Sequence, residues 1–331
     1  MKIAIVKLSS LGDIIHAMVA LQFIKADLNE LQIDWIVEQR FAEVLKYNPH
    51  IDNIHCVDFK SLKKNKSAFF SEIRKIMKYT RFDYDLVIDA QGLIKSAAIS
   101  NLLGKKTAGF DRRSIREKPA SWFYDEKINY PYDANTIDRN VAVIAGALGL
   151  KITPRQIQNK QPFLFFRQTD YEINDFFPGD KKTIVFVIGS TWESRNYPKE
   201  KFHAIAETLE QNCLVIWNTE AERNKAQWLS ERSSYITMLP KIDLNNLKAA
   251  IAKADLLIGN DTGPTHLAWG LNRPSITIFG PTPVNRVYQT SINKVVKSSS
   301  KVNPFKLNKN DFSIRDIHEK LIIEKAIELL K

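Results

Sequence analysis

Residues 258–283, IGNDTGPTHLAWGLNRPSITIFGPTP, have the pattern of a strand, a tight turn, a helix and a second strand. The apolar residues before Asn260 suit a buried parallel strand. Asp261 or Thr262 can cap a helix that starts near Pro264. A helix that begins where a strand ends presents unpaired backbone N–H groups and a partial positive charge. The stretch is therefore typical of either a phosphate or diphosphate site or an ordinary turn of an α/β domain.

Strands and helices alternate along most of the chain. A β-rich run at residues 2–8 precedes a polar turn with Asp13 and a helix, and a second set begins near Thr183. The pattern breaks around residues 160–180, so we place two domains at 1–165 and 166–331. The predicted fold is α/β, with two Rossmann-like α/β/α domains facing a central cleft. The last helix is a candidate to pack back on the N-terminal domain.

Composition bounds the class of protein. No apolar run is long enough to span a membrane, and Met1 leads directly into a strand, which predicts a cytoplasmic protein without a signal peptide. The two cysteines, Cys56 and Cys213, are predicted to be free thiols. The net charge is +11, and residues 60–81 hold eight Lys or Arg against one acid, Glu72. This run suits a solvated helix face, an anionic membrane surface, a phosphorylated substrate or nucleic acid.

Several classes of enzyme are disfavoured because their motifs are missing. The chain has no G-x-G-x-x-G after its first strand, no G-x-x-x-x-G-K-[ST] and no G-x-S-x-G. These absences argue against a dinucleotide-binding dehydrogenase, a P-loop kinase and an α/β-hydrolase. Asp83 and Asp85 form a D-x-D pattern, but they stand at the start of their strand, the wrong end for a site. No recognised nucleic-acid motif accompanies the positive charge.

Four segments together resemble one enzyme family. They are VKLSSLGDIIHAMVAL at residues 6–21, DAQGLIKSA at 89–97, IGSTWESRNYPKEKF at 188–202 and GNDTGPTHLAWGLNRPSITIFGPT at 259–282. In this order they resemble the ADP-heptose:lipopolysaccharide heptosyltransferases over nearly the whole chain. DWIVEQRFAE at 34–43 and the DAQG segment look most like the heptosyltransferase I branch.

The resemblance implies an activity. It implies a GT-B fold and inverting, metal-independent transfer of heptose from ADP-heptose to the Kdo of Kdo-lipid A, without a cofactor. A heptosyltransferase II or III acting on a later core heptose and a sugar-nucleotide epimerase on the same scaffold are the alternatives. It further implies a monomer, peripheral on the cytoplasmic face of an anionic inner membrane, that binds no nucleic acid.

The resemblance also implies the site residues. Asp13 corresponds to the general base, although a helix cap is an equally good interpretation of its position. The donor residues are Ser190, Thr191, Arg195, Glu220, Asp261, Thr262, Gly263 and His266. Glu222 is an alternative to Glu220, Arg195 stands where Lys is more usual, and a helix-packing role is the alternative for His266. The residues expected to bind the acceptor in the N-terminal domain are Lys60, Lys63, Lys64, Lys95 and Arg116.

Overall fold

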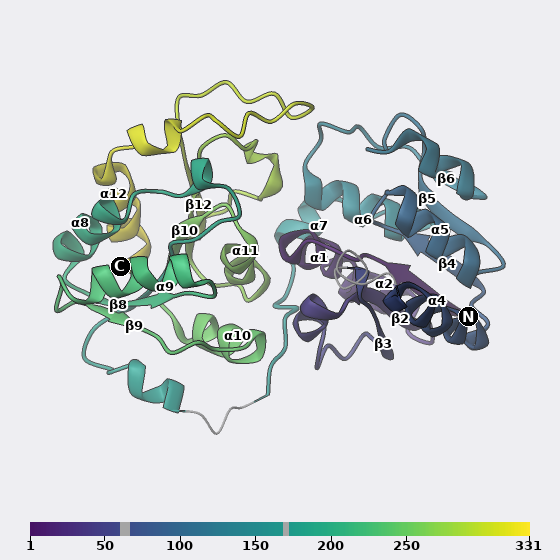
Figure 1. Ribbon diagram of the computed structural model, residues 1–331, viewed down its shortest axis with the longest axis horizontal. Helices are drawn as coiled ribbons and strands as arrows, with labels where there is room; N and C mark the ends of the chain where they lie inside the picture. Colours follow the sequence, from purple (N-terminus) through teal and green to yellow (C-terminus); the bar gives the residue numbers. More distant parts are fainter. Residues whose placement is uncertain (60–66, 168–171) are drawn as a thin grey trace. The chain divides into compact units, whose positions relative to one another are not determined.

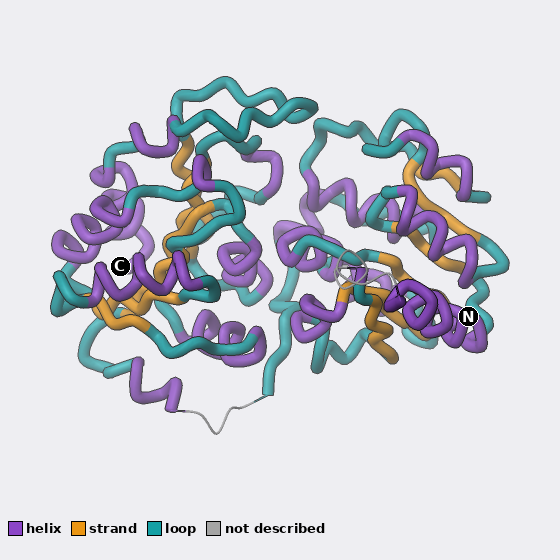
Figure 2. Tube along the Cα trace, viewed as in Figure 1, coloured by secondary structure: helices purple, strands orange, loops and turns teal. Residues whose placement is uncertain are grey.

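The computed structural model describes residues 1–59, 67–167 and 172–331. The chain divides into two compact units, Met1–Phe165 and Phe166–Lys331 (Figure 1). Each unit has one sheet, and Figure 2 shows helices along both faces of the strands.

In the described part of the first unit, six parallel strands are ordered β3-β2-β1-β4-β5-β6. The strands are β1 (Lys2–Val6), β2 (Gln32–Glu38), β3 (Asn53–Val57), β4 (Leu86–Asp89), β5 (Thr107–Phe110) and β6 (Glu126–Ile128). The helices are α1 (Leu11–Met18), α2 (Ala20–Asp27), α4 (Ser67–Tyr79), α5 (Ile94–Leu103), α6 (Thr136–Gly146) and α7 (Pro154–Gln158). Helices α1 and α2 contact α6, whereas α4 contacts α5, so the helices form two separate layers.

The second unit repeats this topology. Its parallel strands are ordered β12-β11-β10-β7-β8-β9. They are β7 (Thr183–Val187), β8 (Asn212–Ile216), β9 (Ile236–Met238), β10 (Leu256–Asn260), β11 (Ser275–Phe279) and β12 (Asn293–Lys297). The helices are α8 (Lys199–Leu209), α9 (Glu220–Ser230), α10 (Leu244–Lys253), α11 (Gly263–Gly270) and α12 (Glu319–Leu330). Both sheets are doubly wound, so the α/β prediction is confirmed.

The central strands are apolar on both faces because helices cover both sides of each sheet. Ile3, Ala4, Ile5 and Val6 of β1 are fully buried. In the second unit, all five residues of β10 are buried as well. The reactive positions of such a sheet lie beyond the carboxyl ends of its strands, where polar residues replace the apolar ones.

The last helix, α12, belongs to the second unit. It contacts α8, β10, β11 and β12. Its Ile322 and Ala326 are fully buried in the same core cluster as Phe202 and Ile276. The buried side of α12 thus packs within the second unit, and packing of its other side on the first domain stays a prediction.

A buried carboxylate joins three strands and the segment before β4 at the amino ends of the first sheet. Asp34 of β2 accepts hydrogen bonds from Asn53 Nδ2 at 2.9 Å and Tyr84 Oη at 2.8 Å, and its Oδ2 lies 2.9 Å from His55 Nε2. Lys2 Nζ is 3.6 Å away. Burial acts to raise the pKa of Asp34, but the hydrogen bonds from His55, Asn53 and Tyr84 and the charge of His55 keep it below its usual value.

Candidate functional site

The turn between β10 and α11 lies at the carboxyl end of the second sheet. Thr262 is the extended N-cap residue of α11, but its side chain makes no capping hydrogen bond. Gly259 allows close packing here, since a Cβ at this position would lie 2.5 Å from Val187 Cβ. Thr262 and Gly263 are only partly buried. The start of this helix therefore presents a hydroxyl group and first-turn backbone to a ligand.

Asp261, directly after β10, is the centre of a polar cluster and is 2 % exposed. Its Oδ2 accepts hydrogen bonds from Arg195 Nη2 at 2.9 Å and Thr282 Oγ1 at 2.7 Å, and its Oδ1 lies 3.3 Å from His266 Nε2. Burial acts to raise the pKa of Asp261, but the hydrogen bond with His266 and the charges of Arg195, His266 and Arg286 outweigh burial and hold the pKa far below its usual range. The carboxylate is therefore ionised.

This geometry gives Asp261 a positioning role. A carboxylate at contact distance would repel a diphosphate, whereas a guanidinium that it holds in place can donate hydrogen bonds to phosphate oxygens. The Arg195 side chain is 13 % exposed, and its guanidinium carbon lies 5.4 Å from the ring centroid of Trp192. Asp261 was predicted to be a donor ligand, and in the structure its carboxylate orients Arg195, Thr282 and His266.

Ser190 and Thr191 follow β7, the strand next to β10. The hydroxyl oxygen of Ser190 is buried and makes no hydrogen bond to any described residue. Leaving a buried hydroxyl unsatisfied costs on the order of 1–3 kcal/mol, so Ser190 is suited to a ligand oxygen or a water molecule. Thr191 is exposed.

Two acids near the start of α9 differ in their surroundings. The Glu220 side chain is 70 % exposed and pairs with Arg223 at 3.2 Å. Glu222 is partly buried and accepts a hydrogen bond from the backbone N–H of Thr219 at 3.0 Å. Its carboxylate packs so closely against Gly189 that a Cβ there would overlap it. Gly189 lies just past the end of β7, so the Glu222 carboxylate is at that strand end; the choice between Glu220 and Glu222 as the ribose ligand stays a prediction.

Thr282 and Arg286, which follow β11, were not predicted from the sequence. Thr282 is 1 % exposed and bonds to Asp261. Arg286 ends a short 3-10 segment, Val284–Arg286, and its buried Nε has no hydrogen-bond acceptor among the described residues. Both lie in the GPTPVNR segment. The pairing of β11 with β10 was the missing information, because it brings this segment to the end of β10.

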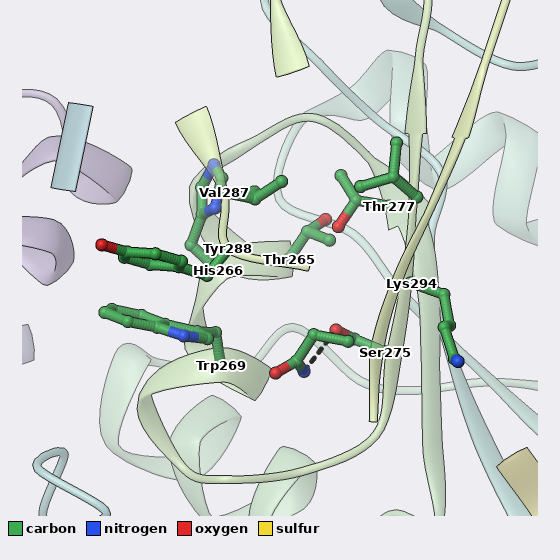
Figure 3. A pocket seen from close by; sticks show the side chains of 10 residues that line it. Thr265, His266, Trp269, Ser275, Thr277, Val287, Tyr288 and Lys294 are labelled. Atoms are coloured by element: carbon green, nitrogen blue, oxygen red, sulfur yellow. Dashed lines mark hydrogen bonds between the residues drawn. The ribbon is translucent and has the colours of Figure 1, made fainter. Parts of the chain in front are cut away.

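A small pocket lies beside α11. Its volume is about 10 Å³, enough for a single water. Figure 3 shows Thr265, His266 and Trp269 on one side of it. The rings of Trp269 and Tyr288 are stacked, with their centroids 6.5 Å apart and an interplanar angle of 19°. Trp269 is 7 % exposed, so it serves as a packing residue.

In the first unit, Asp13 caps helix α1, which was one of the two interpretations of its position in the sequence. Its Oδ2 accepts hydrogen bonds from Ser10 Oγ at 2.7 Å and from Ser10 N at 3.2 Å. The preceding loop is held by Gln91, whose Oε1 accepts from the backbone N–H groups of Leu8 and Ser9 at 3.0 Å each. Asp13 is partly buried at the carboxyl end of β1. A cap of this kind fixes the carboxylate in place and is compatible with a chemical role.

The turn that carries Gln91 is itself built around a buried acid. Asp89 accepts hydrogen bonds from Tyr124 Oη at 2.7 Å, Ser96 Oγ at 2.8 Å, and the backbone N–H groups of Gln91 and Gly92 at 2.8 and 3.0 Å. Burial raises the pKa of Asp89 although these hydrogen bonds oppose it. The DAQG segment thus supports the loop of Asp13.

Two cations that sequence analysis did not single out interact electrostatically with Asp13. Lys7 is 6 % exposed and its Nζ donates to the carbonyl of Ala90 at 2.7 Å. Burial lowers the pKa of Lys7, and the charge of Asp13 opposes that shift. Arg139 of α6 donates a hydrogen bond from Nη2 to the carbonyl of Ser114 at 2.6 Å. Burial lowers the pKa of Arg139, and the charge of Asp13 opposes this shift as well. Asp13 therefore lies in a positive local environment.

The structure describes two of the five basic residues expected to bind the acceptor. Lys95, near the start of α5, lies 3.7 Å from Glu38 Oε1 and 5.1 Å from the ring centroid of Phe59. Arg116 is exposed. The other three, Lys60, Lys63 and Lys64, lie outside the described residues.

The D-x-D acids are structural. Asp83 pairs with Lys105 at 2.7 Å, and Asp85 accepts a hydrogen bond from the backbone N–H of Lys2 at 2.7 Å. Within residues 1–59, 67–167 and 172–331, no group of three or more His, Cys, Asp or Glu side chains could hold a metal ion. In the same ranges, every helix is too short or too polar to cross a membrane.

The two doubly wound units have the GT-B fold, which the chain shares with E. coli heptosyltransferase WaaC. The model of glycosyltransferase family 9 (heptosyltransferase) matches residues 73–314, and the chain belongs to this family.

Individual relatives agree with this assignment. The chain is 34 % identical to lipopolysaccharide heptosyltransferase 1 of Campylobacter coli, over 99 % of both chains. It is 26 % identical to the solved structure of E. coli heptosyltransferase WaaC with ADP, with a TM-score of 0.77 and coverage of 100 % and 99 %. A second WaaC structure, with ADP-2-deoxy-2-fluoro heptose, gives a TM-score of 0.78 at 26 % identity, covering 98 % and 100 %.

Proposed function

We propose that the protein transfers heptose from ADP-heptose to the Kdo of Kdo-lipid A in the synthesis of the lipopolysaccharide inner core, with inversion at the anomeric carbon and without a metal. Family membership supports heptose transfer, and the names of the relatives support the donor and the lipopolysaccharide acceptor. In this proposal the first unit, residues 1–165, binds the acceptor and the second, residues 166–331, binds the donor.

The observation that carries the proposal is the cluster around Asp261. Departure of ADP requires stabilisation of the diphosphate, and in a metal-free mechanism cations and N–H groups must supply it. Arg195, held by Asp261 at 2.9 Å, is the principal cation. Ser190, Thr262 and Gly263 add hydroxyl and backbone donors. In other enzymes, one preorganised donor of this kind is worth about 3–4 kcal/mol in the transition state.

The remaining donor residues have secondary roles in the proposal. Glu222, rather than Glu220, accepts hydrogen bonds from the ribose hydroxyls. His266 keeps Asp261 oriented, since its Nε2 lies 3.3 Å from the carboxylate. The exposed hydroxyl of Thr191 contacts the donor beside Ser190. Arg286, with its unsatisfied Nε, is a second guanidinium for the diphosphate.

The reaction step follows from these roles. The acceptor hydroxyl oxygen attacks the anomeric carbon while the bond from that carbon to the phosphate oxygen breaks. ADP leaves with the bonding electron pair, and the hydroxyl proton passes to the Asp13 carboxylate. Attack from the face opposite the leaving group inverts the configuration. A carboxylate acting as general base typically contributes about 10²–10⁴-fold.

The acceptor and the location follow from charge. Lys60, Lys63, Lys64, Lys95 and Arg116 are proposed to bind the anionic groups of the acceptor. Such an acceptor is an anionic lipid, so we propose that the enzyme works as a monomer, peripheral on the cytoplasmic face of the inner membrane. It needs no cofactor and no nucleic acid in this scheme.

The test is a product assay by mass spectrometry. The enzyme is incubated with ADP-heptose and, in parallel, with Kdo-lipid A or with Kdo-lipid A that already carries one heptose. A gain of one heptose on the first acceptor only is the expected result. A gain on the second acceptor only would identify a heptosyltransferase II or III. Conversion of ADP-heptose without any acceptor would indicate an epimerase and contradict the proposal.

A further inference from the structure

Helix α4 exposes an apolar stripe to solvent. Phe70, Ile73 and Met77 are 75 %, 39 % and 46 % exposed. Their spacing of three and four residues places them on one side of the helix. Phe82, in the 3-10 turn Thr80–Phe82 that follows, is 37 % exposed. The opposite side of α4 faces the core, where Ile76 is 5 % exposed.

Positive charge lies directly beside this stripe. Arg74 and Lys78 are exposed and stand one residue beyond Ile73 and Met77, so they flank the apolar side chains along the same exposed surface. The single acid of α4, Glu72, points inward. It is 8 % exposed and accepts a hydrogen bond from the backbone N–H of Asp58 at 2.8 Å. The exposed face of α4 therefore combines apolar and basic side chains without an acid.

Helix α12 of the second unit provides a contrast. It exposes two apolar side chains, Leu321 at 49 % and Ile327 at 48 %. The exposed charged residues of α12 are Lys320, Glu324 and Glu328, so acids as well as a base accompany its exposed apolar side chains. The basic and apolar combination on α4 is thus not a general property of exposed helices in this chain.

We propose that the exposed face of α4, defined by Phe70, Ile73, Arg74, Met77 and Lys78, docks on an anionic lipid bilayer. A helix lying in the membrane interface buries its apolar side chains among the acyl chains and places Lys and Arg at the lipid phosphates. The charge of the face complements an anionic surface. Long basic side chains beside apolar ones can also extend from the acyl region to the phosphates.

This inference gives a location to the membrane association proposed above and rests on it. The transfer chemistry is independent of it, because none of the five residues belongs to the donor or base machinery. The two proposals can therefore fail separately.

The test measures co-sedimentation of the full chain with vesicles. One set contains equal parts of phosphatidylglycerol and phosphatidylcholine, and the other contains phosphatidylcholine alone. The variants are Arg74→Ser with Lys78→Ser, and Ile73→Ser with Met77→Ser. Removing two basic residues should weaken binding to the anionic vesicles about 25-fold, since each contributes about fivefold. The apolar double variant should lose the binding that persists at high salt.

Leu321→Ser with Ile327→Ser on α12 is the matched control and should bind vesicles like wild type. All variants should retain wild-type transfer to a deacylated acceptor in solution. Binding by both α4 variants at the wild-type level would overturn the assignment to α4. An altered oligomeric state of the α4 variants, with unchanged vesicle binding, would assign the face to a second copy and overturn it equally. If the wild-type enzyme transfers no heptose, the proposed reaction is wrong, and the vesicle experiment still decides whether α4 binds the bilayer.

Discussion

Arg195 Nη2 and Asp261 Oδ2 lie 2.9 Å apart although the residues are 66 positions apart in sequence. Strands β7 and β10 are parallel neighbours, so the segments that leave their carboxyl ends meet. The pair is largely buried, with side chains 13 % and 2 % exposed. Asp261 thus fixes the guanidinium before any ligand arrives, which is what an electrostatic site requires if reorganisation is to be avoided during the reaction.

Asp261→Asn should destabilise the second unit strongly. The change leaves the Arg195 guanidinium buried without its counterion, and breaking one partner of a buried pair typically costs about 3–5 kcal/mol. Urea unfolding measures the loss. Asp255→Asn is the control, because Asp255 pairs with Lys182 at 3.3 Å with both side chains at least 36 % exposed, and about 1 kcal/mol or less is expected there. A loss for Asp261→Asn as small as that of the control would contradict the account.

Arg286→Ala should weaken ADP binding about tenfold, equivalent to roughly 1.4 kcal/mol. The buried Nε of Arg286 has no acceptor among the described residues, and the diphosphate is expected to supply one. Isothermal titration with ADP measures the change, and Arg223→Ala is the control, since Arg223 pairs with the exposed Glu220. Equal affinity of both variants would remove Arg286 from the site.

Glu222→Gln should abolish discrimination between ADP and 2′-deoxy-ADP, while Glu220→Gln should leave it intact. Glutamine can still cap α9, so the helix start is preserved and the test isolates the carboxylate. Competitive binding of the two nucleotides to each variant gives the answer. If Glu220→Gln alone removes the preference, the ribose role returns to Glu220.

Acid should destabilise the first unit through Asp34. The pKa of this buried carboxyl in the folded protein is below its usual value of 3.8, so its stabilisation is present above that value and is lost as the pH falls through the folded-state pKa. Asp34→Asn should cost about 2–3 kcal/mol at pH 7, since charged hydrogen bonds are lost. Urea unfolding from pH 7 to pH 3 should show a smaller loss on acidification for the variant than for wild type. Parallel losses would show that Asp34 does not govern the acid response.

Much of the fold could be read from the sequence because each strand, turn and helix has a local signal. The run before Asn260 is apolar, and Thr262 and Gly263 mark the turn. Strand β12, in contrast, was missed. Its sequence, NKVVK, is short and contains two lysines. Such a sequence is as typical of an ordered loop as of an edge strand.

The partners of the site residues were less predictable because they depend on the order of strands. Asp261 was singled out from its motif, but its contacts with Arg195 and Thr282 arise only when β7 and β11 are placed on either side of β10. The choice between Glu220 and Glu222 depends on the residue at which α9 begins. Moving this start by one residue changes the side of the helix on which each glutamate lies. Sequence spacing does not determine helix boundaries that finely.

Asp13→Asn tests the central claim most directly, since asparagine can still accept the cap hydrogen bond from Ser10 but cannot take a proton from the acceptor. The measurement is the single-turnover rate of heptose transfer with enzyme in excess, together with the affinity for ADP. Asp125→Asn is the matched control, because Asp125 also accepts a backbone N–H and a hydroxyl, those of Thr107 at 2.8 and 2.9 Å, at the amino end of the sheet.

Asp13→Asn should reduce the rate by about 10²–10⁴-fold, with ADP affinity unchanged and the Asp125→Asn rate close to wild type. A rate within threefold of wild type for Asp13→Asn would contradict this prediction.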